Sequence, residues 1–400
     1  MGAPMDLPPA MTARATSGFL DGDDLLAAVR TIAQGPLAEV APDCDQKGVY
    51  PESVLRQLGA VGAMGVHHGD RSALGQTAAA DFGLAIRAAA EVSRVCGATG
   101  FMLWCHQVCG VYMEQSGNPH LGGKALSRHM QGLTLGATGM SNPMKTFAGI
   151  EQFLLRARRD GDAWVVNGTL PWVSNLGTDH YFGAVASVEV AAGEPAHEVM
   201  FIVHCNAPGV ELRNCPSFSA MEGTNTWAVR LTNYRVDNHN LIAHPVRPFI
   251  GRIRGAFVLL QTAMGLGVAQ GAIDSMWKVE QPLGHVNQFL EDRPDELQGE
   301  LDALTERIMR LARTPYESSN SHLIEVLDVR AHASELALRA AQSALLHAGA
   351  RGYLMSSDVQ RRVRESHFVA IVTPALKHLR KEIARLSQPV MPAVDVLEPA

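Results

Sequence analysis

The sequence has few of the features that mark a membrane-spanning or nucleic-acid-binding protein. It holds no run of about 18 uninterrupted apolar residues, so no transmembrane helix is predicted. The 34 Lys and Arg residues are outnumbered by 40 Asp and Glu, which gives a net charge of −6 when the histidines are neutral. Because no basic excess exists to neutralise phosphates, no binding to nucleic acid is predicted.

Cysteine is also scarce, with six residues in 400 and no CxxC pair. A disulfide scaffold is therefore not expected, and the start of the chain shows no signal-peptide pattern, which together favour the cytoplasm. Cys105 and Cys109 lie one helical turn apart, with His106 between them. Since no second ligand pair accompanies them, we interpret the cysteines as buried helix residues and predict no metal site.

Several motifs of catalytic and nucleotide-binding sites are missing. The sequence contains no GxGxxG after a strand, no GxxxxGK[ST], no GxSxG and no HExxH. What it does contain is a globular composition, with 46% hydrophobic and 18% charged residues. A chain of this length and composition is expected to form two or three packed units.

The hydrophobic pattern changes twice along the chain. After a loose tail at 1–16, helical spacing predicts an N-terminal helical domain at 17–132. Short segments bounded by Gly, Asn and Pro then predict a β-sandwich or barrel domain at 133–246. Helical spacing returns and predicts a C-terminal four-helix bundle at 247–400. The predicted fold class is multi-domain α+β.

Three local expectations can be compared with the structure. Gln281–Pro294 breaks the helical pattern and is predicted to be a loop, and Phe368–Leu386 is predicted to be the fourth helix of the bundle. In the predicted strand Thr226–Val236, strict alternation places Leu231 on one face and Tyr234 on the other.

Side chains suited to a flat, hydrogen-bonding ligand occur in two segments of the predicted β-domain. Trp172 offers a flat ring beside the hydroxyl of Ser174, a pairing suited to an isoalloxazine edge, and Ser141 with its neighbouring amides offers further donors. Taken alone, these residues favour a simpler interpretation, a buried Trp at a strand end and a hydroxyl in a turn.

The same segments resemble the acyl-CoA dehydrogenase family. Gly161–Gly168 followed by Trp172–Asn175 is similar to that family's G-D-x-[WY]-x-[IV]-N-G and [WFY]-[IV]-[ST]-N segments. Asn206–Val210 is similar to its N-x-P-G-V turn, and Gly349–Tyr353, followed by Arg364, falls where the family has G-G-x-G-[YF] and the Arg of R-D. The resemblance covers roughly residues 20–386.

The resemblance implies a flavin, FAD or alternatively FMN, bound between the β-domain and the helical bundle. In the family a carboxylate removes the α-proton of an acyl thioester while hydride passes to the flavin. It implies a small-molecule substrate such as an acyl-CoA, together with an electron-transfer or reductase partner. The cofactor-binding residues that it implies are Thr138, Met140, Ser141, Trp172, Val173, Ser174, Gly349 and Gly352.

The chain departs from the family where the base is expected. The family's active-site Glu falls on Thr373, and the alternative Glu position of some relatives falls on Phe257. Threonine cannot act as a base of that strength at neutral pH, so the candidate replacements are Glu365, His367 and Glu222.

A second departure concerns the pyrophosphate of FAD. The family's R-x-x-F-G segment, which grips it across a subunit boundary, falls near Asn287 without an Arg, and the family's Gln before G-G-x-G is Leu346. We therefore expect the adenine half of FAD to be held weakly. The long apolar helices at Gly255–Gly271 and Leu323–Ala350 predict a homo-oligomer, a dimer or tetramer.

Three functions follow as hypotheses. The first is a flavin-dependent oxidoreductase of the acyl-CoA dehydrogenase type with altered chemistry. The second is a flavin-dependent monooxygenase of the same fold, whose relatives also lack the Glu; they often carry a histidine shortly after the R-D arginine, and His367 lies three residues past Arg364. The third is a flavin-free binding protein.

Overall fold

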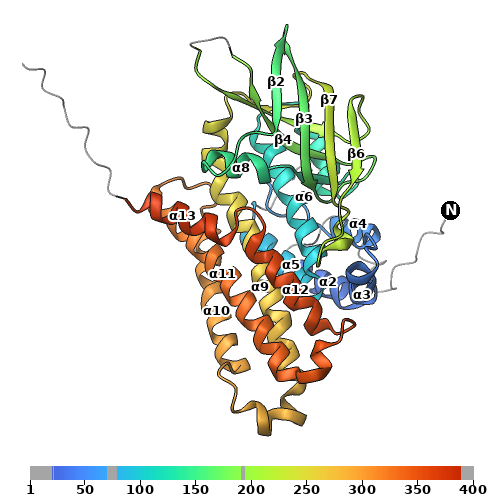
Figure 1. Ribbon diagram of the computed structural model, residues 1–400, viewed down its shortest axis with the longest axis vertical. Coiled ribbons are helices and arrows are strands. Elements are labelled where there is room, and N and C mark those ends of the chain that lie inside the picture. Colours follow the sequence, from blue (N-terminus) through green and yellow to red (C-terminus); the bar gives the residue numbers. More distant parts are fainter. Residues whose placement is uncertain (1–19, 21, 70–78, 191–193, 389–400) are drawn as a thin grey trace, which may run out of the picture.

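The computed structural model describes residues 20, 22–69, 79–190 and 194–388, so the tail predicted at 1–16 lies outside the described residues. Figure 1 shows the β-domain at one end of an elongated molecule, the N-terminal helices beside it and the long C-terminal helices running to the other end. The predicted order of helices, β-domain and helices is confirmed.

The N-terminal part is built from short amphipathic helices around one buried helix, α6. The four large apolar side chains of the first helix, among them Leu25 and Val29, are buried. Asp23 and Asp24 lie in its first turn, where the helix dipole stabilises negative charge. Its elements are α2 (Gly22–Ile32), the π-helical turn η1 (Ala33–Leu37), α3 (Ala38–Gln46), α4 (Glu52–Ala60), α5 (Phe82–Val95), α6 (Gly97–Gln115) and α7 (Gly123–Met130).

Helix α6 is apolar on every side and buried along nearly all its length. Cys105, His106 and Cys109 lie in its buried stretch, and all six cysteines are free. Among the described residues, no group of His, Cys, Asp or Glu side chains could hold a metal ion.

The β-domain is one continuous eight-stranded sheet that encloses its own core. The strand order is β6-β7-β3-β2-β4-β5-β8, with β1 paired to β4. Tyr234 of β7 stacks on Phe201 of β5, and its hydroxyl donates to the Ile202 carbonyl at 3.1 Å, so the two halves of the sheet face each other as in a sandwich. The elements are β1 (Gly136–Thr138), α8 (Ser141–Phe147), β2 (Leu155–Asp160), β3 (Ala163–Val173), β4 (Tyr181–Val188), β5 (Glu198–His204), β6 (Val210–Asn214), η3 (Glu222–Thr224), β7 (Trp227–Val236) and β8 (Leu241–Ala243).

The strict alternation predicted for β7 is wrong after Leu231. Asn233 takes a left-handed conformation with φ +50°, and its partner strand shows a register shift at the same place. This irregularity turns Tyr234 and Val236 into the same core as Leu231.

The C-terminal helices form an antiparallel bundle around α9, the longest helix of the described chain. By length and composition α9 could cross a membrane, but 94% of its apolar window is buried inside the protein, so it is a core helix. The elements are α9 (Val246–Asn287), α10 (Pro294–Leu311), α11 (Asn320–Ala348), η4 (Gly349–Tyr353), α12 (Asp358–Ile371) and α13 (Leu376–Leu386).

Two predictions about the bundle are wrong. The predicted loop Gln281–Pro294 is helical up to Asn287, with Pro282 inside α9. The predicted single helix Phe368–Leu386 is broken between α12 and α13 at Pro374, because proline lacks the backbone donor and disfavours helical geometry at the residue before it. Thr373 therefore lies in the turn between two helices.

Candidate active site

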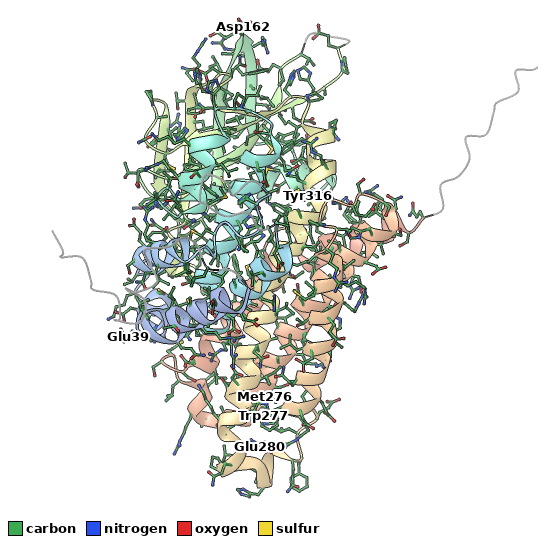
Figure 2. The ribbon with its side chains drawn as sticks, turned by 180° about the vertical axis from the view of Figure 1, so that it is seen from behind. Glu39, Asp162, Met276, Trp277, Glu280 and Tyr316 are labelled. Carbon is green, nitrogen blue, oxygen red and sulfur yellow. The ribbon has the colours of Figure 1, made fainter. Side chains whose placement is uncertain are left out.

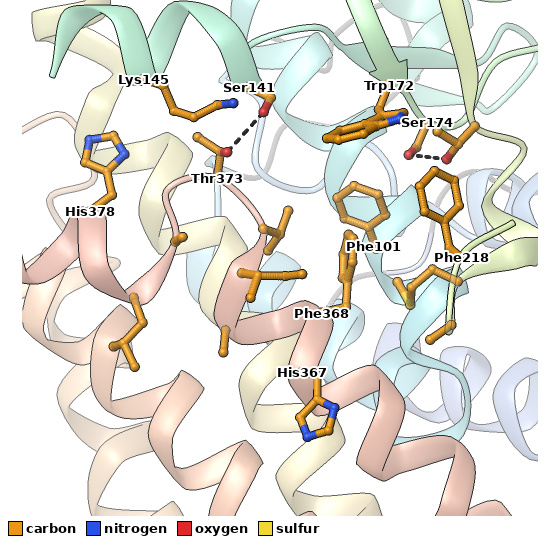
Figure 3. A pocket seen from close by; sticks show the side chains of 18 of the residues that line it. Phe101, Ser141, Lys145, Trp172, Ser174, Phe218, His367, Phe368, Thr373 and His378 are labelled. Atoms are coloured by element: carbon orange, nitrogen blue, oxygen red, sulfur yellow. Dashed lines mark hydrogen bonds between the residues drawn. The ribbon is translucent and has the colours of Figure 1, made fainter. Parts of the chain in front are cut away.

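A cavity of about 1290 Å³ lies where the three parts of the chain meet. Side chains from α6, α9, α11, α12 and α13 line its helical side, and β1, α8, β3 and residues 216–226 line its β-domain side. Figure 3 shows the turn that holds Thr373 reaching up to the β-domain inside this cavity.

Most of the residues predicted to contact a flavin ring meet at the cavity. Three of the predicted positions do not line it: Val173, whose side chain is buried in the β-domain core, and Gly349 and Gly352 of η4. The predicted residues that do line it are Thr138, Met140, Ser141, Trp172, Ser174 and Thr373.

Hydroxyl groups form the β-domain wall of the cavity. The Ser174 and Thr226 hydroxyl oxygens lie 2.6 Å apart, and the Ser141 and Thr373 hydroxyl oxygens lie 3.1 Å apart. The Thr138 hydroxyl lies 2.8 Å from that of Tyr112. Because hydroxyls rotate and can donate or accept, this wall can bond to the carbonyl and ring-nitrogen edge of a flat heterocycle.

Two buried polar side chains that the sequence did not single out hold the Thr373 turn in place. Gln261 of α9 donates to the Thr373 carbonyl at 3.0 Å, and Arg330 of α11 donates from Nε to the Gln261 side-chain oxygen at 2.8 Å. Arg330 also donates to the Val369 carbonyl of α12 at 2.8 Å. Burial lowers the pKa of Arg330. The only sequence signal was a charged residue on the apolar face of a helix.

The structure separates the three candidate bases. Glu365 does not line the cavity; it is buried and accepts a hydrogen bond from the Gly97 amide at 2.9 Å. Glu222 also lies off the cavity and accepts from the Phe218 amide. Of the three, only His367 lines the cavity.

Both carboxylates on the described cavity wall are paired with cations. Glu151 lies 2.9 Å from the ammonium of Lys145, and Glu335 lies 2.8 Å from the guanidinium of Arg380. A substrate proton would therefore have to compete with a cation for the oxygens of either carboxylate. The only polar group of the Thr373 side chain is a hydroxyl, which is not a base at neutral pH.

His378, which from the sequence is interpreted as an ordinary polar residue, also lines the cavity. It is 4% exposed, and its Nδ1 has no hydrogen-bond partner among the described residues. Burial lowers the pKa of His378. A neutral imidazole with an unused nitrogen at the cavity can accept a proton or a hydrogen bond. No sequence pattern predicts this burial, because His378 lies on α13, which begins only after the break at Pro374.

The residues that align with the family's pyrophosphate-binding segment lie at the end of the bundle away from the β-domain. Asn287 is buried there and donates to the His347 carbonyl at 3.2 Å, while Arg293 is paired with Glu280. Figure 2 shows Glu280 near one end of the molecule and Asp162, at the tip of the β-domain, at the other. Within one chain, none of the η4 residues lines the ring cavity.

The chain is similar to known proteins both in sequence and in structure. Residues 21–132 match the family model of the acyl-CoA dehydrogenase N-terminal domain. A probable acyl-CoA dehydrogenase of Bacillus subtilis is 23% identical over 376 residues, covering 89% of this chain and 95% of that protein.

Two solved structures show the same fold. Butyryl-CoA dehydrogenase from Megasphaera elsdenii aligns with a TM-score of 0.79 and 18% identity, covering 92% of this chain and 99% of that one. Dibenzothiophene monooxygenase from Paenibacillus sp. A11-2 aligns with a TM-score of 0.75 and 14% identity, covering 90% and 96%.

These likenesses define the class first: the chain has the fold shared by acyl-CoA dehydrogenases and a related monooxygenase. More particularly, residues 21–132 are similar to the N-terminal domain of acyl-CoA dehydrogenases, and the resemblance to that family predicted from the sequence is confirmed.

Proposed function

We propose that this chain is a flavin-dependent oxidoreductase of the acyl-CoA dehydrogenase type whose chemistry does not use the family's carboxylate base. The observation that supports it best is the cavity, where Ser141, Trp172, Ser174 and Thr373 meet between the β-domain and the bundle. A bound flavin would supply the hydride acceptor. Ser141 and Ser174 would donate hydrogen bonds to its ring, and Trp172 would cover part of it.

The lining residues argue against ordinary α,β-dehydrogenation of an acyl-CoA. Thr373 has no basic group, and the cavity carboxylates Glu151 and Glu335 are held by cations. Losing a general base costs about two to four orders of magnitude in rate. The substrates we favour are therefore those that lose a more acidic proton, or for which His367 or His378 suffices as the acceptor.

Monooxygenation is the second candidate. His367 lines the cavity and lies near the position at which monooxygenases of this fold often carry a histidine. The Paenibacillus structure is that of a monooxygenase, also solved with FMN. Such an enzyme would take reduced flavin from a reductase partner.

Anaerobic mixing tests the first function against the second. The flavin-loaded protein is mixed with a panel of acyl-CoA and related CH–CH compounds while the flavin absorbance is followed. Bleaching by one of them supports the oxidoreductase. If none bleaches the flavin, but a product gains one atom of ¹⁸O when reduced flavin and ¹⁸O₂ are supplied, the monooxygenase replaces it.

For the cofactor we propose that FAD or FMN is held mainly by its ring. The adenine side lacks the family's arginine and glutamine, and two charge-assisted contacts of about 1.5–3 kcal/mol each are missing there. FAD is therefore expected to bind no more than about a hundredfold tighter than FMN, which corresponds to about 2.7 kcal/mol. A larger ratio would show that other groups, such as Arg351, grip the adenine half.

We propose a homo-oligomer, although α9 does not supply the surface from which it was predicted, because α9 is buried within its own chain. Apolar side chains are instead exposed on and around the distal loops, among them Phe289 at 84% and Tyr353 at 75%. A second copy docked at these loops would bring η4 of one chain toward the flavin of the other. A sedimentation coefficient for a stable 43.0 kDa monomer would contradict this.

A further inference from the structure

Aromatic rings form a continuous wall on the helical side of the cavity. Phe101 and Trp104 of α6 stack with ring centroids 5.6 Å apart. Phe101 meets the edge of Phe368 of α12 at 4.8 Å, and Trp104 meets the edge of Phe257 of α9 at 5.1 Å. All four side chains line the cavity.

The packing holds these rings in fixed positions. Phe101, Trp104 and Phe257 are at most 6% exposed. The indole nitrogen of Trp104 donates to the Phe257 carbonyl at 3.3 Å, so its one polar atom is already bonded. The wall therefore has no unbonded polar atom, and the half-buried Phe368 offers more ring surface to the cavity than the three rings packed around it.

Lys145 and His378 lie at the end of the cavity away from these rings, whereas the paired hydroxyls of Ser174 and Thr226 lie beside them. Figure 3 shows Lys145 and His378 at one end, with the Ser141–Thr373 pair between them and the group formed by Trp172, Phe101 and Phe368. At the aromatic end Arg364 is already paired with Asp45 at 2.5 and 2.7 Å. Among the described cavity residues beside the rings, the permanently charged side chain is therefore one that already has its counter-ion.

Rigid rings distinguish a flat ligand from a flexible one. An aromatic ligand gains edge-to-face or offset contacts with each ring of the wall and has no chain torsions to immobilise. An alkyl chain with the same number of carbons buries apolar surface but makes no ring–ring contacts, and it loses rotational freedom on binding.

We propose that the substrate of this cavity carries an uncharged, planar aromatic ring system, which packs against Phe101, Trp104, Phe257 and Phe368 and directs its polar substituent toward the Ser141–Thr373 pair. The inference rests on the proposed function for the position of the flavin, which lies on the β-domain side against Trp172. It adds the class of substrate, which the family resemblance does not give.

Calorimetric titration with matched probes tests the proposal without any catalysis. The probes are 2-naphthol, its saturated counterpart decahydro-2-naphthol, and 1-decanol, each with ten carbons and one hydroxyl. The full chain, with and without FMN, is expected to bind 2-naphthol at least about tenfold tighter than either saturated alcohol, although these are the more apolar compounds. Equal affinities, or tighter binding of a saturated alcohol, would overturn the proposal.

Variants then locate the preference. Phe257→Leu and Phe368→Leu each remove one ring and keep an apolar side chain, and Phe368 is only half-buried. Each substitution should reduce the preference for 2-naphthol about threefold or more. Phe82→Leu is the control, because Phe82 is a buried ring outside the cavity, packed on Tyr316. A preference that survives both cavity variants would also overturn the proposal.

The two levels of inference fail separately. If FMN does not bind while 2-naphthol retains its preference, the proposed function is wrong and the aromatic site stands as a binding site. If FMN binds and the preference is absent, only the substrate class is wrong.

Discussion

Thr373 is the residue that most directly limits what the cavity can catalyse. Its hydroxyl faces that of Ser141, and its carbonyl is held by Gln261, so a side chain grafted at this position would start from a well-fixed backbone. The position is therefore suited to a gain-of-function test.

Thr373→Glu is expected to raise the rate at which butyryl-CoA reduces an artificial electron acceptor by about a hundredfold, because it restores a general base beside the substrate. Thr373→Gln has the same size and no base, so it should show no such gain. Wild-type protein that already desaturates butyryl-CoA at ordinary dehydrogenase rates would reveal an overlooked base.

Glu365 gives a prediction about stability and pH. Burial, and then the neighbouring Cys96, raise the pKa of Glu365 to about 8. In the unfolded chain a Glu titrates near pH 4.3, so between about pH 4.3 and 8 the folded chain binds the extra proton. Its contribution to stability therefore falls as pH rises, by at most about 1.4 kcal/mol per pH unit, and the cost is complete above pH 8.

Glu365→Gln removes this dependence while retaining an acceptor for the Gly97 amide. The free energies of unfolding of the variant and the wild type are measured in urea. The variant's value minus that of the wild type should increase as the pH rises from 5.5 to 7.5. The exposed Glu306→Gln serves as the control for removing a carboxylate outside the core. If the difference between Glu365→Gln and the wild type does not change with pH, Glu365 is ionised in the folded protein.

The site could be predicted from the sequence only where a residue belongs to a recognisable segment. Ser141, Trp172 and Ser174 offer a flat ring and hydrogen-bond donors and also match family segments, and Thr373 was predicted from the family resemblance; all four line the cavity. His378, Gln261 and Arg330 were not, because their roles depend on burial and on partners from other helices, such as Arg330 reaching Gln261 across 69 positions. A side chain's burial in tertiary structure leaves little local pattern.

At the scale of elements, close contact between α9 and α5 depends on a glycine. A Cβ at Gly267 would overlap the Ala90 carbonyl oxygen and the Ser93 side chain, whereas a Cβ at Gly251 of the same helix would meet no atom within 4 Å. The two glycines therefore separate helix propensity from packing.

Gly267→Ala is expected to lower the free energy of unfolding by about 1–3 kcal/mol through overpacking. Gly251→Ala should raise it by about 0.5–1 kcal/mol, because alanine is the better helix former. Thermal or urea unfolding of both variants gives the comparison. A Gly267→Ala variant at least as stable as the wild type would mean that α5 and α9 pack less closely than described.

The bundle predictions failed at prolines, in opposite directions. Pro282 suggested a loop, yet it is exposed, so water can satisfy the carbonyl that loses its donor and α9 continues. Pro374 sits within a segment of helical spacing, and there the helix ends. A proline's local cost was readable from the sequence, but whether the surrounding structure tolerates it was not.

At the scale of the whole molecule, the three-part fold was predictable because the change from helical to strand periodicity is strong and the resemblance spans most of the chain. The cavity was not, since it joins groups far apart in sequence. Ser141 and Thr373 are 232 positions apart and meet only when the bundle docks on the β-domain. The central claim is that this docking creates a ring-binding site.

Titration with FMN tests that claim most directly, because FMN carries the ring and lacks the adenine half. We predict binding of about one FMN per chain, weakened at least about tenfold, or about 1.4 kcal/mol, by Trp172→Ala. Trp277→Ala is the matched control, since Trp277 is similarly exposed, at 48% against 56%, but lies at the far end of the bundle, as Figure 2 shows; its affinity for FMN should equal that of the wild type. Absence of FMN binding, or equal weakening by the two substitutions, would contradict the account.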